Sequence, residues 1–170
     1  FVGVIFMAST RSGYVKFGDF EGEATDSKHK GWSIMHSLSA PLTRATGGFE
    51  QSERGGGATA VGQVTVVKDL DAATVKIQKA CVSGQKLSKV TIDLCTMTGG
   101  ATQAYLSYEL EDAIVTAYDL EEPTDAKSLQ PTERVSFTYG KATWTYGKFG
   151  TDGASQGKVT DNYTVGAAKK

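Results

Sequence analysis

The residues best suited to chemistry are the two histidines, His29 and His36, because an ordinary imidazole changes charge close to neutral pH. His29 follows Glu23 and Asp26 in a short polar segment, and this spacing could be imagined as a metal site. A zinc site needs three or four ligands in a defined geometry, and the chain has neither a Cys-x-x-Cys nor a His-Glu-x-x-His pattern. We therefore interpret the segment as a turn stabilised by local hydrogen bonds and predict no bound metal.

The remaining motifs do not indicate an enzyme. No Gly-x-Ser-x-Gly turn accompanies either histidine. The glycines at 55–57 lack the Gly-Lys-Ser/Thr ending of a phosphate-binding loop, and they precede an expected strand rather than a helix. The acidic stretch 109–112 could supply paired carboxylates for glycoside hydrolysis, but neighbouring acids on a strand are typical of a solvated face. We predict no enzymatic activity, no catalytic residue and no cofactor.

Composition limits the other classes of protein. A chain of 170 residues fits one domain. Its formal net charge is -1, from 18 Lys+Arg and 19 Asp+Glu, and it has no basic stripe, so we predict no nucleic-acid partner. No run of about 18 apolar residues is present, so we predict no membrane insertion. Cys81 and Cys95 are too few for a disulfide framework; we expect reduced, buried thiols, with a single bridge as the alternative.

The two ends of the chain are expected to lie outside the domain. The stretch 1–6 is apolar but short, and it lacks the basic start of a signal peptide. Met7 is a plausible native start, which would make residues 1–6 an expression remnant or upstream read-through; a native N-terminal strand is the alternative. We expect residues 1–12 to be disordered or vector-derived, residues 13–165 to form the domain, and residues 166–170 to be a frayed tail.

Local patterns between these ends predict mostly strands. Twenty glycines and three prolines, with many Thr, Val and Tyr, favour β structure. One helix is predicted over residues 71–83, with Asp71 as its N-cap and Gly84 at its end. The order predicts a mainly β fold, an antiparallel β-barrel or two-sheet sandwich with one flanking helix. The strands are expected over residues 14–20, 34–39, 61–68, 86–97, 103–118 with a bend near 111–112, 133–146 with a bulge near Gly140, and 158–165 as an edge strand.

Three blocks of the sequence, in family order, resemble the Hcp family of tube proteins from bacterial type VI secretion systems. The first resembles the family signature Gly-Glu-Ser-x-Asp-x-x-His, with Ala24 in place of the usual Ser. The second lies in the predicted helix, and the third, 135–146, is similar to the closing strand of the family. The stretch 39–41 departs from the family, which has Ser-Trp-Gly there. The residues that match the first two signatures are Gly22, Glu23, Asp26, His29, Ala80, Cys81 and Gly84.

The resemblance implies a structural subunit. Six copies would form a ring, and stacked rings would form the inner tube of a contractile injection machine. The implied partners are other copies of the chain and the sheath, spike and effector proteins of the machine. The tube would assemble in the bacterial cytoplasm and then be exported, with effectors inside its lumen.

Two surfaces are candidates for contacts in such an assembly. The glycine-rich loop over residues 43–60 is long for a compact domain, and long loops are commonly functional. Its charged residues could fix the register between stacked rings. On the second strand, serines of one parity predict an accessible face that could line the lumen, with an ordinary solvent face as the alternative. The residues concerned are Arg44, Glu50, Glu53 and Arg54 in the loop, and Ser33, Ser37 and Ser39 on the strand.

The alternative function is a monomeric β-sandwich module that binds a carbohydrate or another small ligand. Such a module would use exposed aromatic side chains, for example Tyr105 and Tyr108, as stacking surfaces. Self-association separates the two hypotheses, because a carbohydrate-binding module has no need of a closed ring.

Overall fold

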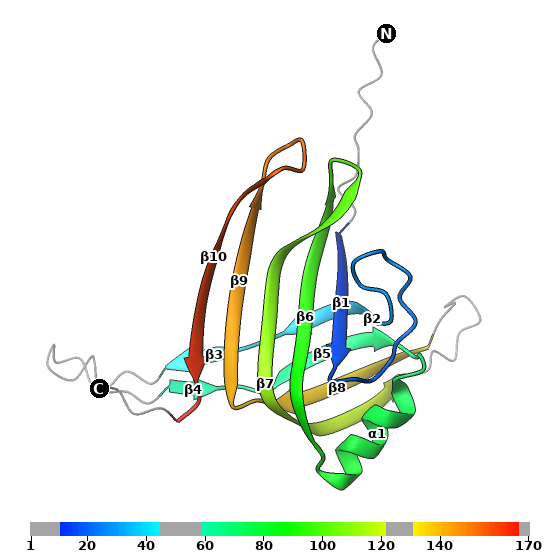
Figure 1. The fold of residues 1–170 in the computed structure, drawn as a ribbon. Coiled ribbons are helices and arrows are strands. Elements are labelled where there is room, and N and C mark those ends of the chain that lie inside the picture. Colours follow the sequence, from blue (N-terminus) through cyan, green and yellow to red (C-terminus); the bar gives the residue numbers. More distant parts are fainter. Residues whose placement is uncertain (1–10, 45–58, 122–130, 167–170) are drawn as a thin grey trace, which may run out of the picture.

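The computed structural model describes residues 11–44, 59–121 and 131–166 (Figure 1). These residues form a mainly β fold with one helix packed beside it. The strands are β1 (Arg11–Phe17), β2 (Ser33–Ser39), β3 (Leu42–Arg44), β4 (Thr59–Val61), β5 (Val64–Asp69), β6 (Lys86–Thr98), β7 (Ala101–Glu121), β8 (Thr132–Thr138), β9 (Lys141–Phe149) and β10 (Ser155–Thr164), and the helix is α1 (Thr74–Ser83).

Six antiparallel strands close into a barrel in the order β7-β6-β1-β2-β5-β8, because β8 also pairs with β7. The long strand β7 makes this closure possible. Its residues 106–111 pair with β9, and its residues 114–121 pair with β8. Asp112 lies between the two halves with a positive φ of 55°, a conformation that Asp tolerates better than most residues. The partner of β7 therefore changes where the sequence predicts a bend.

Alternating side chains from the barrel strands fill the core. Val15 and Phe17 of β1 and Val64 and Val66 of β5 are buried, as the period of two requires. The Phe17 and Phe137 rings meet edge to face with their centroids 5.8 Å apart. The prediction of a β-barrel with one flanking helix is confirmed.

The helix α1 covers the lower end of the barrel in Figure 1. Ile77 and Ala80 on its inner face are fully buried. Gly84 ends the helix in the left-handed conformation (φ 64°), as predicted. The predicted start is wrong, because the N-cap is Ala73 and not Asp71. Asp71 stabilises the preceding turn instead, where its Oδ1 accepts a hydrogen bond of 3.0 Å from the Ala73 N–H.

The predicted strand over residues 133–146 is two strands. Tyr139 and Gly140 separate β8, which closes the barrel, from β9, which pairs with the other half of β7. The parity change near Gly140 therefore marks a strand break, not a bulge. β1 begins at Arg11, two residues before the predicted domain boundary, and residues 1–10 and 167–170 lie outside the described residues.

The hairpin of β9 and β10 extends the sheet beyond the barrel (Figure 1). β10 is an edge strand, as predicted, and nearly all its residues are exposed. The small β3–β4 ribbon lies at the base of the predicted loop over residues 43–60, whose central residues 45–58 are outside the described residues. Neither Cys81, half-buried on α1, nor Cys95, buried on β6, forms a disulfide. Among the helical residues of the described ranges, none belongs to a segment long and apolar enough to cross a membrane.

Candidate functional site

The segment between β1 and β2 folds back on itself and carries the first family-like signature. Three backbone hydrogen bonds of 2.8–3.0 Å join the Gly22, Gly31 and Ala24 amides to the carbonyls of Gly31, Ala24 and Trp32, respectively. A Cβ atom on Gly22 would lie 2.4 Å from the Trp32 carbonyl oxygen. Glycine is therefore required at position 22 for the two arms of the segment to approach so closely.

His29 is the centre of this segment and bridges two carboxylates. Its Nδ1 lies 2.7 Å from Asp26 Oδ1, and its Nε2 lies 2.8 Å from Asp93 Oδ2 on β6. The residue is only 2% exposed. Its ring stacks on Tyr14 at 4.3 Å and meets Trp32 edge-on at 4.9 Å. Carboxylates only accept hydrogen bonds when ionised, so this arrangement favours an imidazolium that donates from both nitrogens.

The ionisation of His29 follows from these contacts. Burial acts to lower its pKa, but hydrogen bonds to Asp93, Cys95 and Asp26 outweigh burial and raise the pKa to about 10. Burial acts to raise the pKa of Asp26, but hydrogen bonds from His29 and from other neighbours lower it overall. At neutral pH His29 is therefore protonated, and its two nitrogens are engaged by Asp26 and Asp93. His29 has no free nitrogen with which to act as a general base or to bind a metal.

The third residue of the imagined metal site does not join this cluster. Glu23 lines a different hollow, together with Asp69 and Asp71. No group of three or more His, Cys, Asp or Glu side chains within the described ranges is arranged to hold a metal ion.

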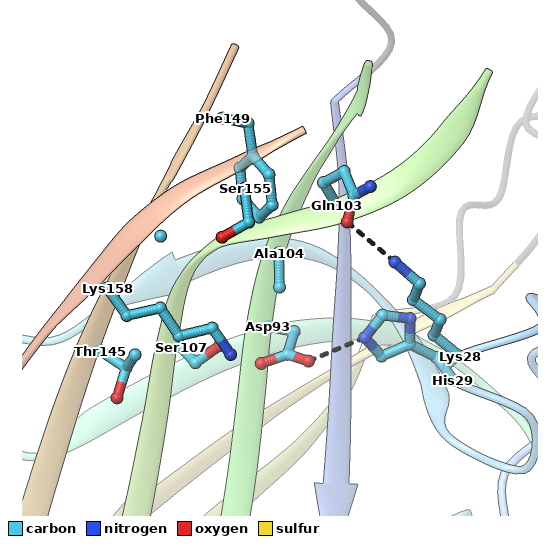
Figure 2. A pocket seen from close by; sticks show the side chains of 11 residues that line it. Lys28, His29, Asp93, Gln103, Ala104, Ser107, Thr145, Phe149, Ser155 and Lys158 are labelled. Carbon is cyan, nitrogen blue, oxygen red and sulfur yellow. Dashed lines mark hydrogen bonds and ion pairs between the residues drawn. The ribbon is translucent and has the colours of Figure 1, made fainter. Parts of the chain in front are cut away.

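A polar hollow of about 490 Å³ lies beside the His29 cluster. Figure 2 shows Lys28 and Gln103 at one end, and Lys158 with Thr145 at the other. Lys28 Nζ donates to Gln103 Oε1 at 2.8 Å and to the Thr102 carbonyl at 2.9 Å. The hollow is suited to polar contacts with another molecule. It offers no nucleophile with a base, because His29 cannot take a proton from Ser107.

The second strand differs from the expected serine face. Ser33 is only 2% exposed, so the prediction that it is accessible is wrong. The pairing of β2 with β5 shifts register between Met35 and Ser37. This irregularity changes the parity, so Ser33 and Met35 face the core whereas Ser37 and Ser39 are exposed.

The predicted loop contacts are described only at the base of the loop. Arg44 is exposed at the end of β3. Glu50, Glu53 and Arg54 lie outside the described residues.

A buried ionic network joins the barrel to α1 and was not predicted. Lys68 Nζ lies 2.5 Å from Glu133 Oε1 and 3.0 Å from Asp71 Oδ1, and Lys68 and Glu133 are both fully buried. The Tyr118 hydroxyl donates to Glu133 Oε2 at 2.8 Å; burial first, and this carboxylate second, raise the pKa of Tyr118 to about 12. The sequence contained one indication that Lys68 is buried, because Lys68 has the same strand parity as Val64 and Val66.

The residues of the second family-like signature have structural roles. Ala80 is fully buried on the inner face of α1, Cys81 packs against the core, and Gly84 ends the helix. Both signatures therefore coincide with positions that fix the two segments packed against the barrel.

A family model described as "Type VI secretion system effector, Hcp" matches residues 14–146. The chain belongs to the Hcp family. The matched residues contain the three blocks on which the resemblance rests, so that identification is confirmed. Hcp proteins are structural tube proteins and not enzymes, which confirms the prediction of no enzymatic activity at the level of the family.

Individual relatives agree with this assignment. The chain is 34% identical over 97 residues to the "Major exported protein" of Pseudomonas aeruginosa, a match that covers 54% of this chain and 56% of that relative. The match thus spans about half the length of the curated relative.

Solved structures share the fold. A type six secretion system protein superposes with a TM-score of 0.82 and 25% identity, covering 92% of this chain and 96% of the other. Hcp1 from Salmonella typhimurium gives a TM-score of 0.71 at 19% identity, covering 91% and 94%. Secreted protein Hcp3 from Pseudomonas aeruginosa gives 0.62 at 18% identity, covering 92% and 98%. The last two likenesses concern the fold alone.

Proposed function

We propose that this Hcp protein forms hexameric rings that stack into the inner tube of a type VI secretion system. The single observation that carries the proposal is the open edge of β10 in a protein of this family. β10 is ten residues long, pairs only with β9 among the described strands, and is exposed along nearly its whole length. An open strand edge of this length is a template for pairing with another chain, and a closed ring would cover it.

The ring requires a heterologous contact, in which one side of each copy meets a different side of the next. β10 lies at the left of Figure 1, and the segment between β1 and β2 lies at the right. A rotation that places these two sides together repeats around an axis and leaves no copy with an open edge. Six copies are the number that the family resemblance implies.

Stacking would use the β3–β4 ribbon and the loop that it supports. The ribbon projects from the barrel at the lower left of Figure 1. Leu42 and Arg44 on the ribbon are exposed and would face a neighbouring ring. Glu50, Glu53 and Arg54 of the same loop remain candidates for polar contacts that set the register.

The lumen would be lined in part by the exposed end of β2. Ser37 and Ser39 present small polar side chains there, and Ser37 borders a hollow of about 300 Å³ together with Arg11 and Tyr105. Such a wall suits transient contacts with effectors that must later be released. Sheath and spike proteins would be the other partners, and the tube would assemble in the cytoplasm before export.

The first experiment is the solution mass by light scattering, with negative-stain images of the same fraction. We expect a particle of six times the 18.0 kDa chain mass and a ring with an open centre. A monomer at all concentrations would contradict the proposal and favour the carbohydrate-binding alternative. In that alternative Tyr108, which packs against the core, is poorly placed to act as a stacking surface.

A further inference from the structure

A small acidic hollow lies beside the segment between β1 and β2. We call it the acidic slot; its volume is about 140 Å³, and it is lined by Glu23, Ala24, Ile34, Asp69, Leu70 and Asp71. Three chain segments contribute to it: the segment between β1 and β2, the strand β2, and the connection from β5 to α1. The hollow has about five times the ~30 Å³ that one water molecule occupies in the liquid, which is room for the end of one long side chain.

One carboxylate oxygen of the slot lacks a hydrogen-bond donor. The Asp71 side chain is only 4% exposed, and its Oδ1 receives Lys68 Nζ and the Ala73 N–H. Its Oδ2 is buried and is the one buried side-chain polar atom without a partner among the residues that the structure describes. A buried acceptor in this state is costly, so a positive charge placed close to the Asp71 carboxylate would stabilise it.

The charge around Asp71 is also unbalanced. Lys68 is the cation of the buried network, and it is shared between two carboxylates, Asp71 and Glu133. Asp69 also lines the slot, and its Oδ1 lies 2.5 Å from Nε2 of a histidine, His36. A second cation at the slot would therefore meet an excess of negative charge.

The slot has an apolar wall as well as carboxylates. Ile34 is 42% exposed although it lies beside buried residues of β2. A wall of this kind fits the methylene stem of a lysine, whose charged head reaches polar groups beyond the stem. The slot thus matches both parts of one long cationic side chain.

Two lysines suited to this role lie on the outer β9–β10 hairpin. Many lysines of the described residues are already bonded to carboxylates, for example Lys89 to Glu109 and Lys141 to Glu111. Lys148 on β9 and Lys158 on β10 are exposed and take part in no ion pair within the described ranges. The outer hairpin therefore has lysines without an ion pair, and the slot has more carboxylates than cations.

We propose that the acidic slot receives a lysine side chain from the outer β9–β10 hairpin of an adjacent copy of this chain. The inference rests on the proposed ring, and it specifies one contact within that ring. The lysine amine meets the carboxylates of Glu23 and Asp69, and its charge lies near the buried carboxylate of Asp71. Its stem lies against Ile34.

The contact can be identified by carboxyl-to-amine cross-linking. Rings are assembled from equal amounts of unlabelled and ¹⁵N-labelled chain, treated with a carbodiimide and digested. We expect mixed-label peptides that join Glu23 or Asp69 to Lys148 or Lys158. Rings that form but yield no mixed-label cross-link from the slot overturn this inference and leave the proposed function standing. A protein that stays monomeric overturns both.

Charge reversal tests how much the slot contributes to self-association. Glu23 is exposed, so Glu23→Lys should fold normally, which circular dichroism would verify. Like charges facing each other cost several kcal/mol, so we expect self-association at least about 100-fold weaker. The matched control is Glu109→Lys, which reverses an exposed carboxylate outside the slot. Reversing the cross-linked lysine to Glu in the Glu23→Lys background should restore assembly. Equal losses in both single variants, or no rescue, contradict the inference.

Discussion

His29 Nε2 and Asp93 Oδ2 are 2.8 Å apart although the two residues are separated by 64 positions in the chain. This bond attaches the segment between β1 and β2 to the barrel wall at β6. The segment contributes to two of the three hollows described above, the polar hollow through Lys28 and His29 and the acidic slot through Glu23 and Ala24. One buried side chain, His29, therefore holds in place the segment that lines both of these hollows.

Replacing His29 should destabilise the fold strongly. In His29→Gln, two carboxylates lose a charged donor in a buried setting, and we expect a loss of about 3–5 kcal/mol in the free energy of unfolding. Urea denaturation measures this loss. His36→Gln is the matched control, because His36 is largely exposed and contacts a single carboxylate, and it should cost under about 1 kcal/mol. Similar losses in the two variants would contradict the role assigned to His29.

The contribution of His29 to the stability of the fold should decrease as the pH becomes alkaline. Its pKa is about 10 in the folded chain and about 6.5 when unperturbed, so the folded state binds the proton more tightly. The stability from this proton is fully present below about pH 6.5 and declines as the pH rises through about 10. The difference in unfolding free energy between the wild type and His29→Gln should shrink over this range. A constant difference from pH 6.5 to 10 would show that the bridge is not charged.

Removing Lys68 alone should be worse than removing the whole ion pair. Lys68→Met leaves Glu133 and Asp71 buried without their cation, and we expect a loss of about 3–5 kcal/mol. The double variant Lys68→Met, Glu133→Leu removes one of these charges as well and should recover a large part of the loss. Chemical denaturation of the single and double variants gives both values. A double variant less stable than Lys68→Met would contradict this account.

A methyl group at position 22 should not be accommodated. Gly22→Ala would place a Cβ 2.4 Å from the Trp32 carbonyl oxygen, which forces the two arms of the segment apart. We expect a loss of about 1–3 kcal/mol, measured as a lower urea midpoint. Ser27→Ala is an exposed change in the same segment and should have little effect. An unchanged midpoint in Gly22→Ala would show that the close approach is not needed for stability.

A charge on the edge strand should separate folding from assembly. Val159 on β10 is 62% exposed, so Val159→Lys should change the free energy of unfolding by less than about 0.5 kcal/mol. If β10 meets a neighbouring copy, the same change should lower the particle mass in light scattering. Val82→Lys, on the 82% exposed Val82 of α1, is the control and should leave the mass unchanged. A full-size particle from Val159→Lys would contradict the contact at β10.

Local rules predicted the parts of the fold that depend on local physics. Gly84 ends α1 because the left-handed conformation is cheap only for glycine, and that requirement is visible in the sequence. The strand predicted over residues 86–97 is also found, and its alternating residues Val90 and Ile92 are buried. Parity is a weaker guide near an irregularity. Ser33 was misplaced because the register shift after Met35 has no signature in the residues themselves.

The candidate site depended on contacts that no local pattern contains. Asp93 has the parity of an outward-facing residue, and only the folded chain brings it to His29. Lys68 has the strand parity of the core residues, although a charged side chain is usually exposed. It is buried because Glu133, 65 positions away, provides its ionic partner. Gly140 separates two strands because β7 changes partner at Asp112, which is a property of the whole sheet.

β7 belongs to two structures at once, and this has a mechanical consequence. Its first half holds β9 and its second half holds β8 within one continuous strand of 21 residues. A force applied to the outer hairpin along the strand direction is transmitted to the barrel through β7, the strand that the two parts share. Several hydrogen bonds between β7 and β9 then share the load in shear, instead of opening one after another. The hairpin is thus attached rigidly to the barrel, without a hinge between the two.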